Sequence, residues 1–238
     1  MKVAIAAFAK TIGLSPVKTR LAAEIGEQKA EEFYRLSVAA IEEIMLAVKQ
    51  SDPDVYTFWA LAEESAVRLR QWQKLECLWT GEGGLGTRLA NISEALFTTH
   101  DAVIFIGTDS PQISPAHLAK TVEYLNSGSA DCVFGPALDG GFYLFGTTNP
   151  VSRDVWENVT YSTDTTLAEL QGQISMAGLK IQELEVEQDV DQLPDLAALV
   201  DRLQNDRGSL LLSQVSLLKH LLAMPDINDT SPQNFDLE

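Results

Sequence analysis

Cysteine, histidine and basic residues are scarce in this sequence of 238 residues. Two cysteines, Cys77 and Cys132, are too few for a disulfide framework or a four-thiolate metal site, and the three histidines show no metal-ligand spacing. Seventeen Lys and Arg against 34 Asp and Glu give a net charge of −17. Because so acidic a body repels polyphosphate chains and anionic lipid, we expect neither nucleic acid nor a membrane surface as its main partner.

Long hydrophobic runs are also lacking. Lys10 interrupts the short apolar start, and no signal-peptide cleavage pattern or apolar run of about 18 residues follows. We therefore expect a cytoplasmic protein. The length allows one large domain, which we predict over residues 1–224. Residues 225–238 are polar and acidic, and we expect them to form a flexible tail.

Apolar runs typical of buried strands alternate with segments of helical periodicity. Strands are expected at 3–8, 54–61, 75–79, 102–106, 131–136, 142–145 and 179–184. Helices are expected at 27–49, 64–71, 86–98, 114–126, 163–176, 195–204 and 210–222, whereas 9–23 is expected to be a loop. The alternation predicts an α/β fold of three layers, with an open, mostly parallel sheet and helices on both faces.

Basic residues follow the first strand, where a sheet of this kind binds ligands. Lys10 ends the strand, and Lys18 and Arg20 lie two residues apart in the expected loop. In extended chain the last two share a face, and two converging cations suit a diphosphate. A solvated basic loop is the alternative, and for this segment alone it is the more common outcome.

Acidic residues follow later strands. Asp109 comes directly after the apolar strand 102–106, so its carboxylate is expected to face the crevice, where a hard divalent cation takes oxygen ligands. Capping of the next turn is the alternative. Asp139 precedes Gly140 and Gly141, a pattern of a tight turn or of backbone lying against a ligand. Asp189 and Asp191 are separated by one residue, so on a strand they would share a face and could complete a metal site. A solvated acidic face is the stronger alternative there.

A glycine-rich loop spans 81–86, between a strand and a helix. It is neither the dinucleotide fingerprint nor a P-loop, and a plain turn is as good an interpretation as a ligand-binding loop.

Taken together, however, seven motifs occur in one order: FAK at 8–10, VKTRL at 17–21, LGxR at 85–88, GTDSP at 107–111, GPAxDGGFYL at 135–144, ST at 162–163 and DxD at 189–191. In this order and spacing the sequence resembles the DUF2064 family, glycosyltransferase-like members of the nucleotide-diphospho-sugar transferase (GT-A) superfamily.

The resemblance covers roughly residues 1–200 and implies a fold, a cofactor and site residues. It implies an open sheet that binds a nucleotide or nucleotide sugar, with Mg²⁺ or Mn²⁺ held by Asp109 and Asp191. Asp139 is the expected catalytic residue beside an acceptor. The residues assigned to nucleotide binding are Lys10, Lys18, Arg20, Gly86 and Arg88, and those assigned to substrate binding are Gly140 and Gly141.

Three functions remain open at this point. The leading one is a metal-dependent glycosyltransferase that uses a nucleotide-diphospho-sugar donor and a small-molecule acceptor. The KTRL string also resembles the 2-phospholactate guanylyltransferase group, so a nucleotidyltransferase is the alternative within enzymes. Departures from the family pattern at Ile12, Leu14, Ser15, Thr80 and Tyr161 motivate a third, a catalytically silent nucleotide-binding protein. Much of the circumference of helix 210–222 is apolar, so we expect this helix to close the edge of the sheet, and a contact in a homo-oligomer is the alternative.

Overall fold

Seven strands form one sheet in the order β3-β2-β1-β4-β6-β5-β7. This computed structural model describes residues 1–228. The strands are β1 (Val3–Ala9), β2 (Val55–Leu61), β3 (Glu76–Trp79), β4 (Ala102–Ile106), β5 (Cys132–Pro136), β6 (Phe142–Thr147) and β7 (Ile181–Glu183). The α-helices are α1 (Thr19–Ile25), α2 (Glu27–Ser51), α3 (Leu85–Phe97), α4 (Pro115–Ser127), α5 (Arg153–Asn158), α6 (Thr166–Met176), α7 (Leu193–Asn205), α8 (Leu212–Leu222) and α9 (Pro225–Asn228).

The predicted open, mostly parallel sheet is confirmed. β1 pairs in parallel with β2 and β4, β2 with β3, and β5 with β7. Only β6 among these strands runs the other way, antiparallel to β4 and β5. Its direction follows from the short turn at residues 137–141, because a connection of a few residues can join neighbouring strands only when they are antiparallel.

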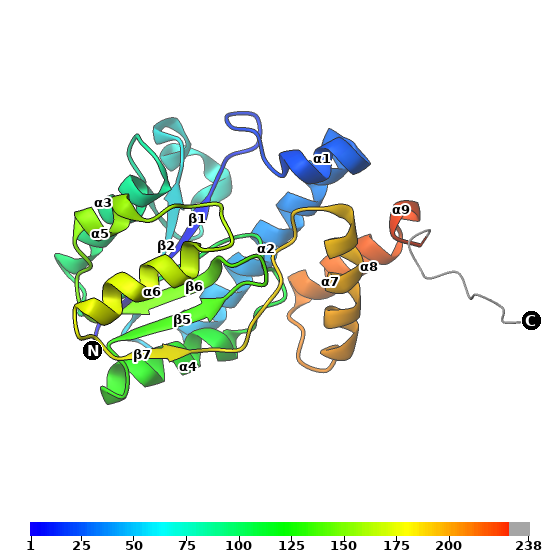
Figure 1. Ribbon diagram of the computed structural model, residues 1–238. Helices are drawn as coiled ribbons and strands as arrows, with labels where there is room; N and C mark the ends of the chain where they lie inside the picture. The colour runs from blue at the N-terminus through cyan, green and yellow to red at the C-terminus, as the bar shows by residue number, and fades with distance from the viewer. Residues whose placement is uncertain (229–238) are drawn as a thin grey trace, which may run out of the picture.

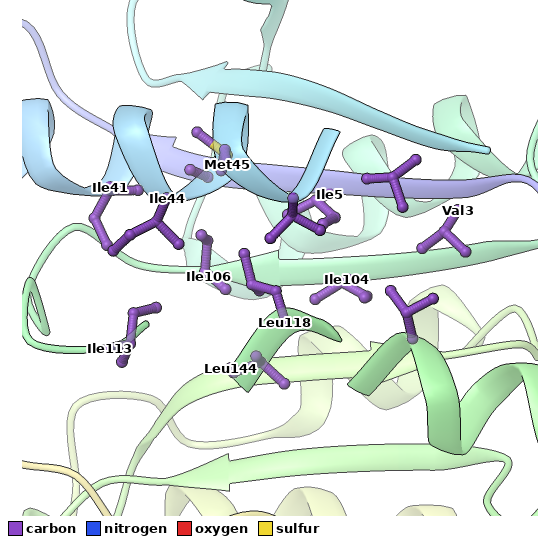
Figure 2. Packing of buried hydrophobic residues seen from close by; sticks show 14 of the residues in the cluster. Val3, Ile5, Ile41, Ile44, Met45, Ile104, Ile106, Ile113, Leu118 and Leu144 are labelled. Atoms are coloured by element: carbon purple, nitrogen blue, oxygen red, sulfur yellow. The ribbon is translucent and has the colours of Figure 1, made fainter. Parts of the chain in front are cut away.

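Helices cover both faces of the sheet, and each face has its own apolar cluster (Figure 1). On one face, α2 places Ile41, Ile44 and Met45 over the side chains of β1 and β4, as Figure 2 shows. On the other face, α3, α5 and α6 pack against alternate residues of the same strands. Burying an Ile or Leu side chain completely contributes about 1.5–3 kcal/mol, so these two clusters hold the strand ends in fixed positions.

A third apolar cluster lies beyond the sheet. It joins α1 and the first turns of α2 to α7, α8 and α9 through residues such as Phe33, Leu199 and Leu217. Figure 1 shows α7, α8 and α9 to one side of the sheet, beside α1 and α2. This cluster brings the chain after β1 close to the chain before α7, segments about 170 residues apart.

Three local expectations were wrong. The segment 9–23 is not wholly a loop, because α1 begins at Thr19 and Lys18 stands at its N-cap with φ 45° and ψ 45°. The short helix expected at 64–71 is two 3₁₀ turns, η1 (Glu64–Arg68) and η2 (Arg70–Trp72). Helix α5 was missed, since a helix of six residues is too short to show a helical period in sequence.

The chain after α8 is helical for one more turn. The first four residues of the expected tail, 225–228, form α9, because the buried side chain of Ile227 packs in the third cluster. The remainder of that expected tail, 229–238, lies outside the described residues. Within residues 1–228, no helix is both long and apolar enough to cross a membrane.

Candidate functional site

A cleft of about 790 Å³ opens where β1, β2 and β4 end. β4 is apolar and buried over its whole length, so the chain first becomes polar just beyond it, at residues 107–110. In a sheet of this kind that edge is the place where ligands bind. Of the residues assigned from sequence, those lining the cleft are Lys10, Lys18, Arg20, Arg88, Asp109, Asp139, Gly141 and Asp191.

Two glycines assigned to binding, Gly86 and Gly140, are not among the lining residues. A Cβ on Gly86 would lie 2.2 Å from the Trp156 carbonyl oxygen, so this glycine lets α3 pack closely against α5. Gly140 has φ +86°, and a Cβ there would lie 2.1 Å from the Asp164 carbonyl oxygen. Both glycines therefore permit close approaches between protein segments.

The guanidinium of Arg88 donates hydrogen bonds within the protein. Its Nε donates to the carbonyl oxygen of Gly83 at 3.0 Å, and one terminal nitrogen donates to Ala62 O at 3.0 Å and to Thr80 Oγ1 at 2.8 Å. Arg88 thus ties the glycine-rich loop to the end of β2. In this arrangement it shapes one wall of the cleft.

Tyr34 fixes the end of β1 from α2. Its hydroxyl accepts from the Lys10 backbone N at 2.8 Å and donates to the Lys10 carbonyl oxygen at 3.0 Å. Burial raises the pKa of this hydroxyl to about 12, so Tyr34 stays neutral and keeps both bonds. The side chain of Lys10 is left exposed at the cleft, while its backbone is held firmly.

Lys18 lies at the centre of the site and is surrounded by oxygen atoms. Its Nζ is 2.6 Å from Asp109 Oδ1 and 3.4 Å from Asp191 Oδ1, and it also donates to the carbonyl oxygen of Val190. Arg20 reaches the other oxygen of Asp191 at 3.2 Å. Although the segment is not extended as expected, Lys18 and Arg20 do converge, and the group on which they converge is Asp191.

Asp189 is an acid of the cleft that the sequence assignment did not select, although the 189–191 pattern drew attention to it. It accepts a hydrogen bond from Ser110 Oγ. Burial raises its pKa to about 7, with Asp109 and Asp139 adding to the rise and Ser110 and Lys18 opposing it. The two acids share a side not because they lie on a strand, since β7 ends at Glu183, but because Val190 between them is buried.

Asp139 stands in the turn between β5 and β6. Its Oδ1 accepts from the Gly141 backbone N at 2.8 Å, while the residue as a whole is exposed at the cleft. One carboxylate oxygen is therefore used by the turn. Asp139 is placed where a bound molecule in the cleft could contact it.

An aromatic wall, defined as Phe8, Phe105, Phe142 and Tyr161, also lines the cleft. The sequence analysis assigned none of these four residues to binding, because aromatic side chains are typical of any core. The Tyr161 hydroxyl donates to the Trp156 carbonyl oxygen at 2.9 Å, and burial raises its pKa. The wall offers an apolar face of the kind that a base or a sugar ring packs against.

The carboxylates do not form a closed metal cage. Within residues 1–228, no group of three or more His, Cys, Asp or Glu side chains has an arrangement that could hold a metal ion. A cation held by two of these carboxylates would therefore complete its coordination with water or with oxygen atoms of a bound substrate. Such shared coordination is usual for Mg²⁺, which commonly takes one or two carboxylates together with phosphates and water.

Sequence comparison identifies the family. A family model described as "Uncharacterized protein conserved in bacteria (DUF2064)" matches residues 36–163, more than half of the chain. The protein belongs to the DUF2064 family. The matched region of this DUF2064 protein includes Asp109 and Asp139 and excludes Lys18 and Asp191. Among curated proteins, none matches the sequence.

Solved structures confirm the fold of this DUF2064 protein. A protein from Desulfovibrio desulfuricans G20, provisionally named a nucleotide-diphospho-sugar transferase, is 23% identical with a TM-score of 0.80, over 96% of this chain and 97% of the other. A 4-diphosphocytidyl-2C-methyl-D-erythritol synthase from Anaerococcus prevotii DSM 20548 is 9% identical with a TM-score of 0.52, over 81% and 94%. A cytidylyltransferase from Leptospira borgpetersenii serovar Hardjo-bovis (strain JB197) is 14% identical with a TM-score of 0.51, over 98% and 99%. The fold is therefore that of the nucleotide-diphospho-sugar transferases, as the sequence predicted.

Proposed function

We propose that this protein is a metal-dependent glycosyltransferase that uses a nucleotide-diphospho-sugar donor. The observation that carries the proposal is the meeting of Asp109, Asp191 and Lys18 at the end of β4, inside the cleft. Oxygen ligands and basic side chains at that position suit the diphosphate of a donor. The description of the Desulfovibrio desulfuricans structure, which matches nearly the whole chain, supports the same choice.

The residues present fit a divalent cation. The donor set consists of carboxylate oxygens from two segments, which Mg²⁺ and Mn²⁺ prefer, and the Lys18 ammonium already occupies the space between them as a stand-in cation. Asp109 and Asp191 would hold the ion. When bound, it would offset the negative charge that grows on the departing diphosphate.

The chain's own residues supply the other parts of the reaction. Arg20 and Lys10 would bind phosphate oxygens from the side of β1. In glycosyl transfer the bond from the sugar carbon to the diphosphate oxygen breaks, and a new bond forms to the acceptor oxygen. Asp139, exposed at the cleft, would orient the acceptor hydroxyl and take its proton. The aromatic wall would exclude water from one side of the donor.

Nucleotidyl transfer is a second candidate, because the Anaerococcus and Leptospira structures have the same fold and are described as a synthase and a cytidylyltransferase. The two reactions share the need to neutralise phosphate charge and differ in what is released. Glycosyl transfer releases a nucleoside diphosphate, whereas nucleotidyl transfer from a nucleoside triphosphate releases pyrophosphate.

Product analysis distinguishes these candidates. The protein would be incubated with Mn²⁺ and either a panel of nucleotide sugars or nucleoside triphosphates with phosphorylated small molecules, with Asp109→Asn as the matched control. We expect a nucleoside diphosphate that accumulates only with the wild-type chain. Pyrophosphate release would favour the second candidate. Metal-dependent nucleotide binding without either product would identify a silent binding protein.

A further inference from the structure

Lys18 differs in backbone conformation and burial from a lysine that only binds phosphate at a surface. Its backbone lies in the left-handed region, and the only other non-glycine residue with positive φ among residues 1–228 is Ser162. Its side chain is 3% exposed, although it lines a cleft. An unfavourable backbone and a buried ammonium are tolerated only where neighbouring groups compensate for both.

The compensating groups use every donor that Lys18 has. An ammonium carries three N–H groups, and Asp109, Asp191 and the Val190 carbonyl oxygen are three acceptors. The ring of Phe33 lies below the ammonium, with its centroid 5.9 Å from Nζ. No donor of Lys18 therefore remains for a phosphate while this arrangement persists.

These three acceptors are held together independently of Lys18. The Val190 backbone N donates to the Asp109 carbonyl oxygen at 3.0 Å, which fixes the two segments side by side. The Asp195 carboxylate accepts from the Asp191 backbone N at 2.9 Å. Two carboxylates and a carbonyl oxygen thus converge on one point, and a positive charge must stand there because like charges repel.

We propose that the Lys18 ammonium is a resident cation that a divalent ion must displace in order to bind Asp109 and Asp191. The oxygen atoms that hold Nζ are those that a hard cation would take, so the two occupy the same position in turn. Displacement would free Lys18 to point into the cleft, where its charge becomes available to a phosphate. The proposal rests on the metal site of the proposed function.

Metal affinity without nucleotide tests the displacement. Binding of Mn²⁺ alone would be measured by calorimetric titration for the wild-type chain, Lys18→Met and Lys10→Met. Lys10→Met is the matched control, because it removes the same charge from the same cleft but from outside the Asp109–Asp191 pair. We expect Lys18→Met to bind Mn²⁺ at least tenfold more tightly than wild type and Lys10→Met to stay within threefold. The proposal would be overturned if Lys18→Met bound Mn²⁺ no more tightly than wild type, or if neither wild type nor Lys18→Met bound Mn²⁺.

A second measurement uses the unchanged protein, in case Lys18→Met does not fold. Brief acetylation with a small amine-reactive acetyl ester, which transfers its acetyl group to lysine and releases its alcohol, would be performed with and without saturating Mg²⁺ and followed by peptide mass spectrometry. Because the buried side chain of Lys18 is protected in the metal-free state, we expect its acetylation to rise at least fivefold with Mg²⁺, while that of Lys10 stays constant. Continued protection of Lys18 at saturating Mg²⁺ contradicts displacement. Both readouts are independent of turnover, so a failure of the proposed reaction would leave them unchanged.

Discussion

Arg202 of α7 reaches the buried carboxylate of Glu187, with 2.9 Å between the guanidinium nitrogen and Oε1. Gln112 donates to Oε2 of the same carboxylate at 3.1 Å, and His117 of α4 lies 3.5 Å from Oε1. Glu187 therefore joins two helices to the segment that continues to Asp189. Burial alone would raise its pKa, but the contacts with His117, Arg202 and Gln112 outweigh burial and lower the pKa to about 2.

Glu187→Gln should lower the free energy of unfolding at pH 7 by about 2–4 kcal/mol, because an amide with a single acceptor oxygen replaces the carboxylate that accepts from both Arg202 and Gln112. Since the folded pKa is depressed, this contribution is fully present above the ordinary pKa of about 4.5 and is lost as pH falls toward about 2. Urea unfolding at pH 7 and pH 3 measures it.

The control for Glu187 is Asp206→Asn, which removes the other and more exposed partner of Arg202. We expect it to cost less than about 0.5 kcal/mol, as is usual for a surface pair. A difference between wild type and Glu187→Gln that stayed the same at pH 3 would contradict the assigned pKa.

Asp189 should make stability depend on pH in the opposite sense. Because its pKa is raised from 3.8 to about 7 in the folded chain, the favourable contribution is present below about pH 4 and is lost as pH rises to about 7. Asp189→Asn stays neutral, so its stability relative to wild type should rise by about 1–2 kcal/mol between pH 4.5 and 7.5. Paired urea curves in metal-free buffer provide the measurement, and a constant difference would show that Asp189 has an ordinary pKa.

Gly140→Ala tests the close approach behind the cleft. The new Cβ would meet the Asp164 backbone in a region of φ that favours glycine, so we expect a loss of about 1–3 kcal/mol and a shifted loop at 160–165. Gly172→Ala is the matched control. Gly172 lies in α6 with open space around it, and alanine there should stabilise by about 0.5–1 kcal/mol. Thermal unfolding of both variants measures the contrast, and equal effects would mean that the turn adapts freely.

Asp109→Asn should weaken nucleotide binding in the presence of Mn²⁺ at least tenfold and leave nucleotide binding in EDTA nearly unchanged. The amide keeps the size of the side chain and one oxygen but loses the charge that a divalent cation requires. Calorimetric titration of one nucleotide under both conditions measures the difference. Wild-type affinity with Mn²⁺ would show that Asp109 only organises the turn after β4.

The sequence by itself determined the fold and the edge of the sheet at which the candidate site lies. The unbroken apolar run of β4, the glycines around Asp139 and the alternation of strands with helices are local patterns, and local patterns follow from backbone geometry and burial. The helix expected at 114–126 is likewise present as α4, with Ser114 at its N-cap and Pro115 at its first position. These features place acids and bases at the same edge of the sheet, because parallel strands end together.

Only the tertiary structure decided how those residues are paired. Lys18 meets Asp191 across 173 positions because α1, α7 and α8 pack into one apolar cluster, and no local pattern encodes that packing. The same is true of Arg88, which donates to two loop carbonyl oxygens and to the Thr80 hydroxyl. It is also true of Glu187, whose carboxylate is contacted by His117 of α4 and Arg202 of α7. A sequence shows which side chains can ionise, whereas burial and the distance to the nearest opposite charge decide what each one does.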